Sequence, residues 1–243
     1  MTERGTRSIL AGMKHTELFA ATLLDCSATI AAPIIPLDDY PWFALPRIAG
    51  FLVALLADPP PGYHLAAPGI LVGEGCRLSA RAELVGPAII GPGTELRTGA
   101  FIRENVIIGA RCVVGNSTEL KNCILFDEVQ APHFNYVGDS ILGRRAHMGA
   151  GSTLSNLKSD KSEVAVRLPD GTSVPTGLVK FGAILGDQVE LGCNAVCNPG
   201  SVAGRASRVY PLAGLRGFLP ERTILKAGGQ RVVMKGRAGE AES

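Results

Sequence analysis

Apolar residues recur every six positions along much of this chain. Stepping by six from residue 72 meets ten apolar side chains without a miss: Val72, Leu78, Leu84, Ile90, Leu96, Ile102, Ile108, Val114, Leu120 and Phe126. With 46% hydrophobic residues overall, such a run arises by chance about 4 times in 10,000 for one reading frame. The period breaks near Pro132, resumes two residues out of phase and returns after an interruption, at Leu142, Met148, Leu154, Leu185, Leu191, Cys197, Ala203, Val209 and Leu215.

A six-residue period matches neither an α-helix nor an alternating sheet strand, and it is typical of parallel β-helices. Each hexad supplies a short strand and a turn, and Gly follows many of the apolar positions, as at Gly91 and Gly109. Three hexads form one triangular coil of about 18 residues, so residues 18 apart stack at about 4.8 Å. Residues 70–155 and 182–217 then give about seven coils around a continuous core. We therefore expect a mainly β, parallel β-helical fold.

Other segments flank or interrupt the coils. Residues 1–66 are expected to form a helical N-terminal cap, with helices over 16–24 and 42–56 that cover the open end of the first coil. The β-helix is expected over 67–218, with a loop insertion over 156–181 in which Pro169-Asp-Gly171 forms the turn of a hairpin. Residues 219–243 are expected to form a C-terminal extension.

Charge and composition exclude several classes of protein. The 24 basic and 22 acidic residues leave a net charge of +2, so no basic field indicates a nucleic-acid partner. The most hydrophobic stretch, residues 42–57, is interrupted by Pro46 and Arg47 and falls short of the roughly 20 apolar residues of a membrane span. The apolar run near the start is too short for a secretory leader. We expect a cytoplasmic protein that binds neither nucleic acid nor membrane.

The six cysteines lie among the apolar positions without the C-x2-C spacing of zinc sites. We expect them to be buried, reduced thiols. A metal site built from histidines, of the γ-carbonic anhydrase kind, would need three of them. Besides His133 and His147 only His15 and His64 are present, both outside the repeats, so no metal is expected.

Charged residues occupy turn positions that elsewhere carry Gly or another small residue, namely Arg97, Arg103, Lys121, Asp127 and His133. Departures from a local pattern are where functional residues are sought. Arg103 and Lys121 lie 18 residues apart, so they would stack on one edge of the prism. This pair is either a solvated charged face or, with an anionic phosphate, a binding site.

His133 lies where the six-residue frame slips, beside Asn135 and Tyr136. Such a histidine is either a satisfied structural residue or a functional one, because breaks in a repeat re-aim side chains. His147 follows 14 residues later and could approach His133 from the neighbouring coil.

The motifs around these residues resemble a known enzyme family. Arg103, the stretches Gly115-Asn-Ser-Thr-Glu-Leu-Lys121 and His133-Phe-Asn-Tyr-Val-Gly-Asp139, and Met148-Gly-Ala-Gly151 resemble the acetyltransferase half of the bifunctional N-acetylglucosamine-1-phosphate uridyltransferase/glucosamine-1-phosphate N-acetyltransferase. Segments 156–161, 180–187 and 198–200 look more like archaeal-type sugar nucleotidyltransferase/acetyltransferases. The resemblance covers about residues 70–220. It implies a left-handed β-helix that forms a homotrimer with active sites between subunits.

The resemblance also implies a reaction. His133 would be the general base that takes a proton from the amine of an amino-sugar phosphate or nucleotide sugar as the amine attacks acetyl-CoA. Arg103 and Lys121 would hold the sugar phosphate. Tyr136 and Asn156 would fix the sugar and the base by hydrogen bonds.

Further residues are placed by the same resemblance. Ala150 and the loop at Cys193 would contact the acetyl group and pantetheine arm of acetyl-CoA, and Lys226 would meet a CoA phosphate. His147 stands where the bacterial family has a substrate-binding Asn, and Leu157 stands where it has Tyr. These two departures allow a different acceptor.

The nucleotidyltransferase half of the family has no counterpart here, because only about 70 residues precede the coils, too few for an α/β nucleotide-binding domain. We therefore expect no nucleotidyltransferase activity from this chain alone. Two functions stay open. One is an acetyl-CoA-dependent sugar N-acyltransferase connected with UDP-N-acetylglucosamine biosynthesis, and the other is a non-catalytic sugar-phosphate-binding or scaffold trimer.

Overall fold

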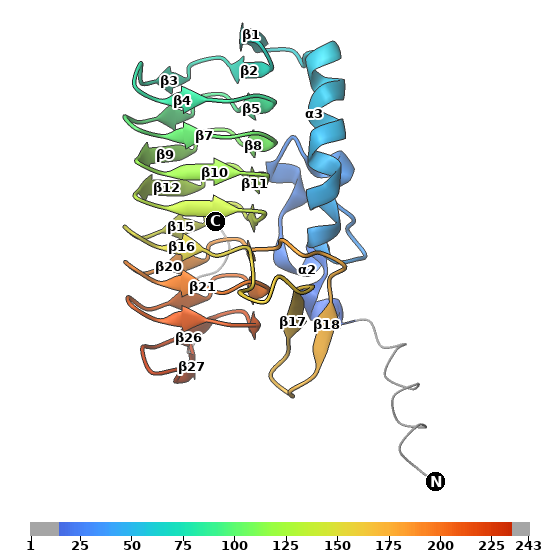
Figure 1. Cartoon of the computed structure of the whole chain (residues 1–243), viewed down its shortest axis with the longest axis vertical. Coiled ribbons are helices and arrows are strands. Elements are labelled where there is room, and N and C mark those ends of the chain that lie inside the picture. The colour runs from blue at the N-terminus through green and yellow to red at the C-terminus, as the bar shows by residue number, and fades with distance from the viewer. Residues whose placement is uncertain (1–14, 235–243) are drawn as a thin grey trace, which may run out of the picture.

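Short strands stack on three faces of a triangular prism (Figure 1) in the computed structural model, which describes residues 15–234. Sheet A contains β1 (Tyr63–Ala67), β2 (Ile70–Gly73), β5 (Ala88–Ile90), β8 (Val106–Ile108), β11 (Cys123–Leu125), β14 (Ile141–Leu142), β19 (Ala183–Leu185), β22 (Ser201–Ala203) and β25 (Phe218–Leu219). Sheet B contains β3 (Arg77–Leu78), β6 (Glu95–Leu96), β9 (Val113–Asn116), β12 (Gln130–His133), β15 (His147–Met148), β20 (Glu190–Leu191), β23 (Arg208–Val209), β26 (Thr223–Leu225) and β27 (Arg231–Val233). Sheet C contains β4 (Glu83–Leu84), β7 (Phe101–Ile102), β10 (Glu119–Lys121), β13 (Tyr136–Gly138), β16 (Thr153–Leu154), β21 (Val196–Cys197) and β24 (Gly214–Leu215).

Each coil adds one strand to each face, in the order A, B, C. In Figure 1 the strands of sheet C cross the front toward sheet A, the chain returns behind through sheet B, and each coil lies below the one before it. This is the left-handed sense, so the prediction of a left-handed parallel β-helix is confirmed. Within the described part of the chain sheet A has nine strands, of which only β1 is antiparallel, so the stack is longer than the seven or so coils expected.

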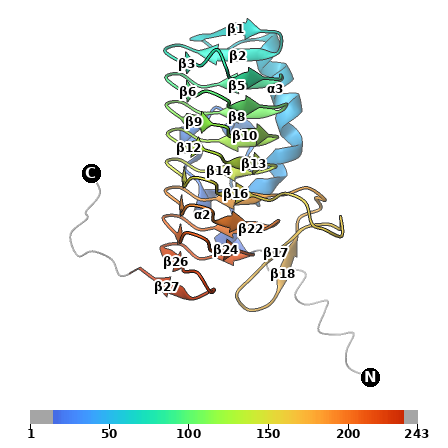
Figure 2. The same cartoon turned by 60° about the vertical axis from the view of Figure 1, so that its left-hand side comes forward.

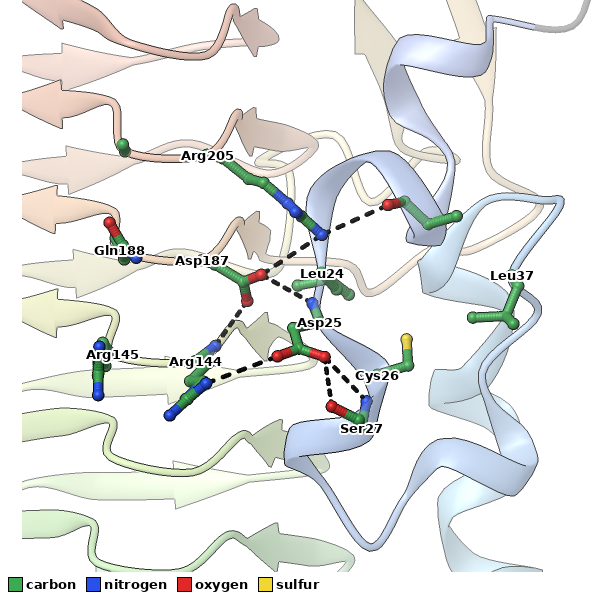
Figure 3. A pocket seen from close by; sticks show the side chains of 12 residues that line it. Leu24, Asp25, Cys26, Ser27, Leu37, Arg144, Arg145, Asp187, Gln188 and Arg205 are labelled. Carbon is green, nitrogen blue, oxygen red and sulfur yellow. Dashed lines mark hydrogen bonds and ion pairs between the residues drawn. The ribbon is translucent and has the colours of Figure 1, made fainter. Parts of the chain in front are cut away.

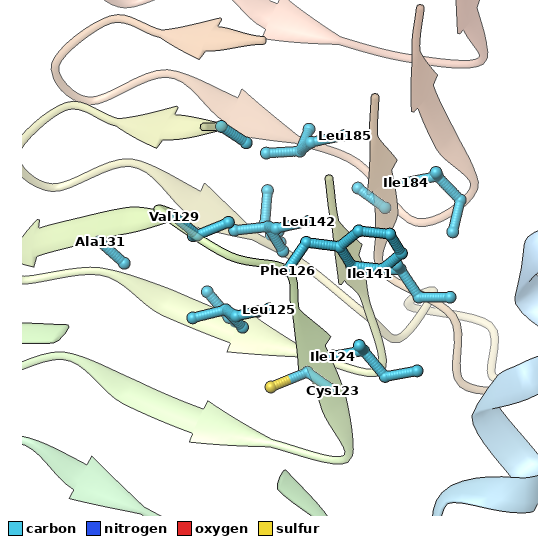
Figure 4. Packing of buried hydrophobic residues seen from close by; sticks show 14 of the residues in the cluster. Cys123, Ile124, Leu125, Phe126, Val129, Ala131, Ile141, Leu142, Ile184 and Leu185 are labelled. Atoms are coloured by element: carbon cyan, nitrogen blue, oxygen red, sulfur yellow. The ribbon is translucent and has the colours of Figure 1, made fainter. Parts of the chain in front are cut away.

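Inward-facing side chains of successive coils form continuous columns. Leu125, Leu142 and Leu185 lie in register on neighbouring strands of sheet A and point into the prism (Figure 4). Leu125 lies opposite Ile108, so this coil is one residue shorter than 18, and the next coil, which ends at Leu142, is equally short. These two losses of one residue explain the change of phase in the sequence. They also correct the repeat, because Leu125 rather than Phe126 is the strand residue that faces inward.

Sheet A is buried on its outer face as well. Ile124, Ile141 and Ile184 point away from the prism interior toward the N-terminal helices (Figure 4), and all three are fully buried. Strands of sheets B and C instead alternate buried residues with exposed or half-buried ones, as in β20 and β21. An apolar outer face exists only where another layer covers it.

The N-terminal segment supplies that cover. It comprises the 3-10 helices η2 (Thr16–Leu18), η3 (Cys26–Ala28), η4 (Ala32–Ile34) and η5 (Pro41–Arg47) and the α-helices α2 (Ala20–Leu23) and α3 (Ile48–Ala57). Within the predicted helix over 42–56, the stretch that contains Pro46 is a 3-10 helix, because proline cannot donate the backbone hydrogen bond of an α-helix interior. Trp42 is fully buried, with its ring centroid 5.6 Å from that of Phe181.

The prediction that these helices cap the first coil is wrong. They lie along the side of the stack (Figures 1 and 2), with α3 packed against β8. The first coil is covered instead by β1, which pairs antiparallel with β2. Leu78 of that coil keeps 37% of its surface exposed, although it belongs to the apolar repeat.

A charged seam attaches the N-terminal segment to the corner between sheets A and B (Figure 3). The carboxylate of Asp187 accepts hydrogen bonds from the backbone N–H groups of Asp25 (2.7 Å) and Arg144 (2.8 Å). Arg144 also lies 3.7 Å from the Asp25 carboxylate, and Arg205 lies 3.5 Å from that of Asp187. Burial raises the pKa of Asp187. Because these cations already face carboxylates, the hollow of about 610 Å³ beside them is a structural joint.

The predicted loop insertion contains the predicted hairpin. Strand β17 (Ala165–Arg167) pairs antiparallel with β18 (Ser173–Pro175), and Leu168 N–H donates to the Thr172 carbonyl across the turn. The hairpin projects from the lower half of the prism (Figure 2). No helix within residues 15–234 is long and apolar enough to cross a bilayer.

The six cysteines are free thiols, as expected, but they are not all buried. Burial raises the pKa of the Cys112 and Cys197 thiols to about 12, so these two are inert core residues. Cys193, by contrast, is exposed. The expectation of buried thiols is therefore wrong at this position, which lies at a corner rather than inside a strand.

We expect Leu125→Ala to lower the free energy of unfolding by about 2–5 kcal/mol, because it opens a cavity in a fully buried column. Leu65→Ala is the matched control, since Leu65 is 61% exposed, and it should change stability by less than about 0.5 kcal/mol. Urea unfolding followed by circular dichroism measures both, and equal effects would contradict the assigned register.

Glu128, which is paired with Arg144 of the seam, predicts a dependence of stability on pH. Hydrogen bonds from Arg145 (2.8 Å) and Arg144 (3.0 Å) lower the pKa of Glu128 to about 2. Because the pKa of Glu128 is lower in the folded state, its ionised carboxylate stabilises the fold at pH values above the unfolded-state pKa of about 4.5. This stabilisation is lost as the pH falls toward 2. Glu128→Gln should therefore be less stable than wild type at pH 7, and the difference should shrink between about pH 4.5 and 2. Glu83→Gln, at an exposed position, should show no such trend in the same urea titrations.

Candidate functional site

The predicted site residues lie along the two edges of sheet C. One edge, the BC corner, joins sheets B and C and carries Asn116, His133, Ala150 and Cys193 on successive coils. Gly151 N–H donates to the His133 carbonyl (3.1 Å), and Asn194 N–H donates to the Ala150 carbonyl (2.9 Å). The structure thus brings His133 together with two residues predicted to contact acetyl-CoA.

The turn after His133 is held by a buried asparagine. Asn135 accepts a hydrogen bond from His133 N–H (3.2 Å) through Oδ1. Its Nδ2 donates to the Gly149 carbonyl (2.9 Å) and to Ser152 Oγ (3.0 Å). Phe134, between His133 and Asn135 in the sequence, has a φ of 51° and is 60% exposed. Because Asn135 fixes the backbone, the exposed His133 side chain stands at a defined place on the corner.

The other edge, the CA corner, joins sheets C and A and carries Arg103 and Lys121. Arg103 N–H donates to the Leu120 carbonyl (2.9 Å), so these two cations occupy equivalent positions on adjacent coils, as the spacing predicts. Each of them faces a carboxylate: Arg103 Nη1 donates to Glu119 (2.9 Å), and Lys121 Nζ lies 4.0 Å from Asp139. The expected cationic edge is therefore largely neutralised within the chain.

Asp139 is the central acceptor of the CA corner and is only 4% exposed. Its carboxylate accepts hydrogen bonds from the side-chain amides of Asn122 (2.8 Å) and Asn156. The backbone of Asp139 is in the left-handed region, with a φ of 46°. One buried carboxylate thus connects Lys121, on one coil, to Asn156, two coils further.

Tyr136 lies between the two corners on the outer face of sheet C, in register with Glu119 and Thr153. Burial, followed by the charges of Glu119 and Asp139, raises the pKa of its hydroxyl. A Cβ at Gly138 would lie 2.6 Å from the Tyr136 hydroxyl oxygen and 2.7 Å from Asn156 Nδ2. Glycine is therefore required there for the Tyr136 and Asn156 side chains to converge over the strand.

His147 and Lys226 lie apart from this group. His147 is half-buried on sheet B, in register with Gln130 and Glu190. Because Gln130 precedes His133 by three residues, His147 is displaced from His133 by three positions along the strand. The structure does not bring it to Tyr136 or Asn156. Lys226 follows the inward-facing Leu225 on sheet B, at the side of this sheet that leads to the BC corner.

No group of three or more His, Cys, Asp and Glu residues within 15–234 could hold a metal ion. Two acidic residues of the site were not singled out from the sequence, Glu119 and Asp139. Both stand inside the motifs that carry the resemblance, and Glu119 lies two residues before Lys121, hence on the same outer face of its strand. This alternation of faces along the strand could have identified Glu119 as a neighbour of the predicted cations.

We expect Asp139→Asn to lower the free energy of unfolding by roughly 1–3 kcal/mol, because an amide presents N–H groups to buried donors that now lack an acceptor. Asparagine tolerates the left-handed backbone at this position, so the change reports the carboxylate alone. Asp38→Asn, at an exposed position, is the matched control. Chemical denaturation compares the two variants, and equal stability would show that Asp139 is not the acceptor described.

Comparison with known proteins places these corners in a family. Residues 84–207 match the family model described as the GMPPB C-terminal domain. A bifunctional sugar-1-phosphate nucleotidylyltransferase/acetyltransferase from Sulfurisphaera tokodaii is 33% identical over 112 residues, 46% of this chain and 28% of that protein. The bifunctional protein GlmU of Methanococcus maripaludis is 38% identical over 110 residues, 45% of this chain and 26% of that protein. The chain thus spans about a quarter of the length of these relatives.

A putative uncharacterized acetyltransferase of Escherichia coli, YaiX, is 29% identical over 154 residues, 63% of this chain and 66% of that protein. Among solved structures, a mutant of the N-acyltransferase AntD from Bacillus cereus, in complex with dTDP-4-amino-4,6-dideoxyglucose and coenzyme A, has 16% identity and a TM-score of 0.43, over 68% of this chain and 83% of that one. The family model covers about half of the sequence, including both corners of sheet C from Arg103 to Asn198, and on this match the chain belongs to the GMPPB C-terminal domain family.

Proposed function

We propose that this chain is an acetyl-CoA-dependent N-acyltransferase that acts on an amino-sugar phosphate or a nucleotide sugar. The observation that carries the proposal is the BC corner, where an exposed histidine, Ala150 and Cys193 follow one another on three successive coils. The outer face of sheet C leads from His133 to the polar side chain of Tyr136 and then to the cations of the CA corner. A general base, a place for a thioester and a place for an acceptor therefore share one face.

The chemistry assigned to His133 is proton removal. The acceptor amine attacks the thioester carbonyl carbon, the C–N bond forms, and the C–S bond breaks to release CoA. His133 takes the proton that the amine loses, and the sulfur of CoA takes up a proton as it leaves. A histidine at neutral pH is suited to both directions of this transfer.

Arg103 and Lys121 are proposed to hold the phosphate of the acceptor. Both cations are already oriented by carboxylates, Arg103 by Glu119 and Lys121 by Asp139. A phosphate would add to this network as a further acceptor, since a guanidinium carries five donors and an ammonium three. Tyr136 would meet the sugar between the phosphate and the reacting amine.

Acetyl-CoA is proposed to lie along the BC corner. Ala150 and Cys193 continue the column of His133, and Lys226 follows Leu225, two coils beyond Leu191 on sheet B. An extended pantetheine arm could run along this edge, with a CoA phosphate at Lys226. His147, on the neighbouring face, is proposed as a contact to the acceptor from a second subunit.

A homotrimer is proposed because the site is open on one side. His133 and the neighbouring Phe134 are exposed, and a second chain against the BC corner would enclose them. A cytoplasmic location is proposed as well, and the free thiols are consistent with such a reducing compartment. The names of the relatives also support acetyl transfer, because two of them are called acetyltransferases.

We expect His133→Ala to reduce the release of CoA thiol from acetyl-CoA by about 10²–10⁴-fold in kcat, with little change in the KM of either substrate. The acceptors would be glucosamine 1-phosphate and a panel of nucleotide-linked amino sugars, with thiol release followed colorimetrically. His64→Ala removes an exposed histidine on β1, far from sheet C, and should leave the rate unchanged.

If wild-type protein releases no CoA with any acceptor, yet binds the sugar phosphates in calorimetry, the proposal is wrong. The alternative of a non-catalytic sugar-phosphate-binding or scaffold trimer would then hold. A rate that survives in the His133 variant would reject His133 as the base while leaving the acyltransferase itself in place.

A further inference from the structure

A second cationic region lies between the β17–β18 hairpin and the last coils. Two adjoining hollows, of about 500 and 820 Å³, share Arg167, Ser173 and Arg216 in their walls. The second hollow is also lined by Arg231, from β27. Arg167 and Arg231 lie outside the columns of His133, Tyr136 and Lys121, and Arg216 lies in the column of Lys121, four coils further along the stack.

Close backbone contact fixes the arrangement of these arginines. Gly217 has a φ of 72°, and a Cβ there would collide with the Arg167 backbone. Gly200 has a φ of 82°, and a Cβ there would lie 2.7 Å from the Ala165 carbonyl oxygen. Strand β17 therefore rests directly on the corner of the coils, which sets Arg167 beside Arg216. Arg231 is held from the other side, where its Nη1 donates to the Phe218 carbonyl (3.1 Å).

The charges of this region are not balanced within the described residues. Arg167, Arg216 and Arg231 form no ion pair within residues 15–234, and the wall of the larger hollow contains no carboxylate. Asp160 lines the smaller hollow. Its carboxylate accepts a hydrogen bond from the Ser162 hydroxyl (2.9 Å) and lies 3.6 Å from Lys158 Nζ, so it is paired with residues other than the three arginines. The cations of the seam and of the CA corner, by contrast, face carboxylates.

Three guanidinium groups around one hollow indicate a phosphorylated ligand. Guanidinium donates two parallel hydrogen bonds to a phosphate, and more than one phosphate is needed to engage all three groups. The walls contain no aromatic ring on which a nucleobase could stack. Recognition would therefore rest on the phosphates.

The hollow is too far from Lys121 for one diphosphate to contact both. Lys121, Gly138, Ser155, Asn198 and Arg216 are equivalent positions on successive coils. Four steps of about 4.8 Å separate Lys121 from Arg216, or roughly 19 Å, several times the spacing of two linked phosphates. We propose that Arg167, Arg216 and Arg231 form a diphosphate-binding site that is separate from the site on sheet C.

Inorganic pyrophosphate is the probe, in isothermal titration calorimetry with full-length protein at low ionic strength. Wild type should bind it at one site per chain and should bind orthophosphate about tenfold more weakly or worse. The double variant Arg167→Gln/Arg216→Gln should raise the dissociation constant for pyrophosphate by about tenfold or more. Arg81→Gln removes an exposed arginine at the opposite end of the stack and should change it by less than about twofold.

A second variant tests the geometry without changing the charge. Gly217→Ala keeps all three arginines but pushes the hairpin away from the coils, so it should also weaken pyrophosphate binding. Circular dichroism checks that the stack stays folded. An ADP arm distinguishes the source of the diphosphate: tighter binding than pyrophosphate indicates a nucleoside diphosphate, and equal binding indicates the bare diphosphate.

Three results would overturn the proposal. One is the absence of pyrophosphate binding to wild type, and another is an equal loss of affinity in Arg81→Gln. The third is full displacement of pyrophosphate by saturating CoA, which would assign the arginines to the acyl-donor site. None of these readouts depends on acyltransferase activity, so failure here is distinct from failure of the function proposed above.

Discussion

The narrow interior of the prism is the constraint on which this structure depends. Each strand has room to place one aliphatic side chain inside, and the chain must turn before the next strand begins. The period of six follows from this, and so do the glycines behind many apolar positions. Because successive coils stack in register, each residue of a coil belongs to a column that runs along the prism. A functional residue is thus positioned by its coil and its place within that coil.

This rule made much of the site predictable from the sequence. The spacing of Arg103 and Lys121 placed them on adjacent coils, and the register confirms it. The resemblance assigned His133 and Ala150 to one reaction, and the structure stacks the two residues on adjacent coils of the BC corner. Sequence could not show that Glu119 and Asp139 neutralise the two cations, since the ion pairs depend on which rotamers the neighbouring coil leaves open.

The position of the helices was open to prediction but was missed. One apolar residue precedes the inward-facing residue in every third hexad, as at Ile89, Ile107, Ile124, Ile141 and Ile184. This second column marks one face of the prism as covered, and the N-terminal segment is the layer that covers it. The arginine cluster below the hairpin was not predictable in the same way. It forms only because Gly200 and Gly217 let β17 rest on the coils, a contact between segments that the repeat does not relate.

The cations Arg103 and Lys121 differ from the arginine cluster in a way that bears on their use. At Arg103 and Lys121 the charge is balanced before any ligand arrives, so a phosphate gains little long-range attraction and must be recognised by hydrogen-bond geometry, which suits a substrate that has to be oriented and released. At Arg167, Arg216 and Arg231 the repulsion between like charges is left in place, and a dianionic ligand would relieve it on binding. A cluster of like charges without carboxylate partners lowers the stability of the fold. The hairpin that brings Arg167 to the other two arginines pairs only with itself, as β17 with β18, so the stack of coils does not need it for its own ladders. That is the physical reason to assign the cluster a ligand.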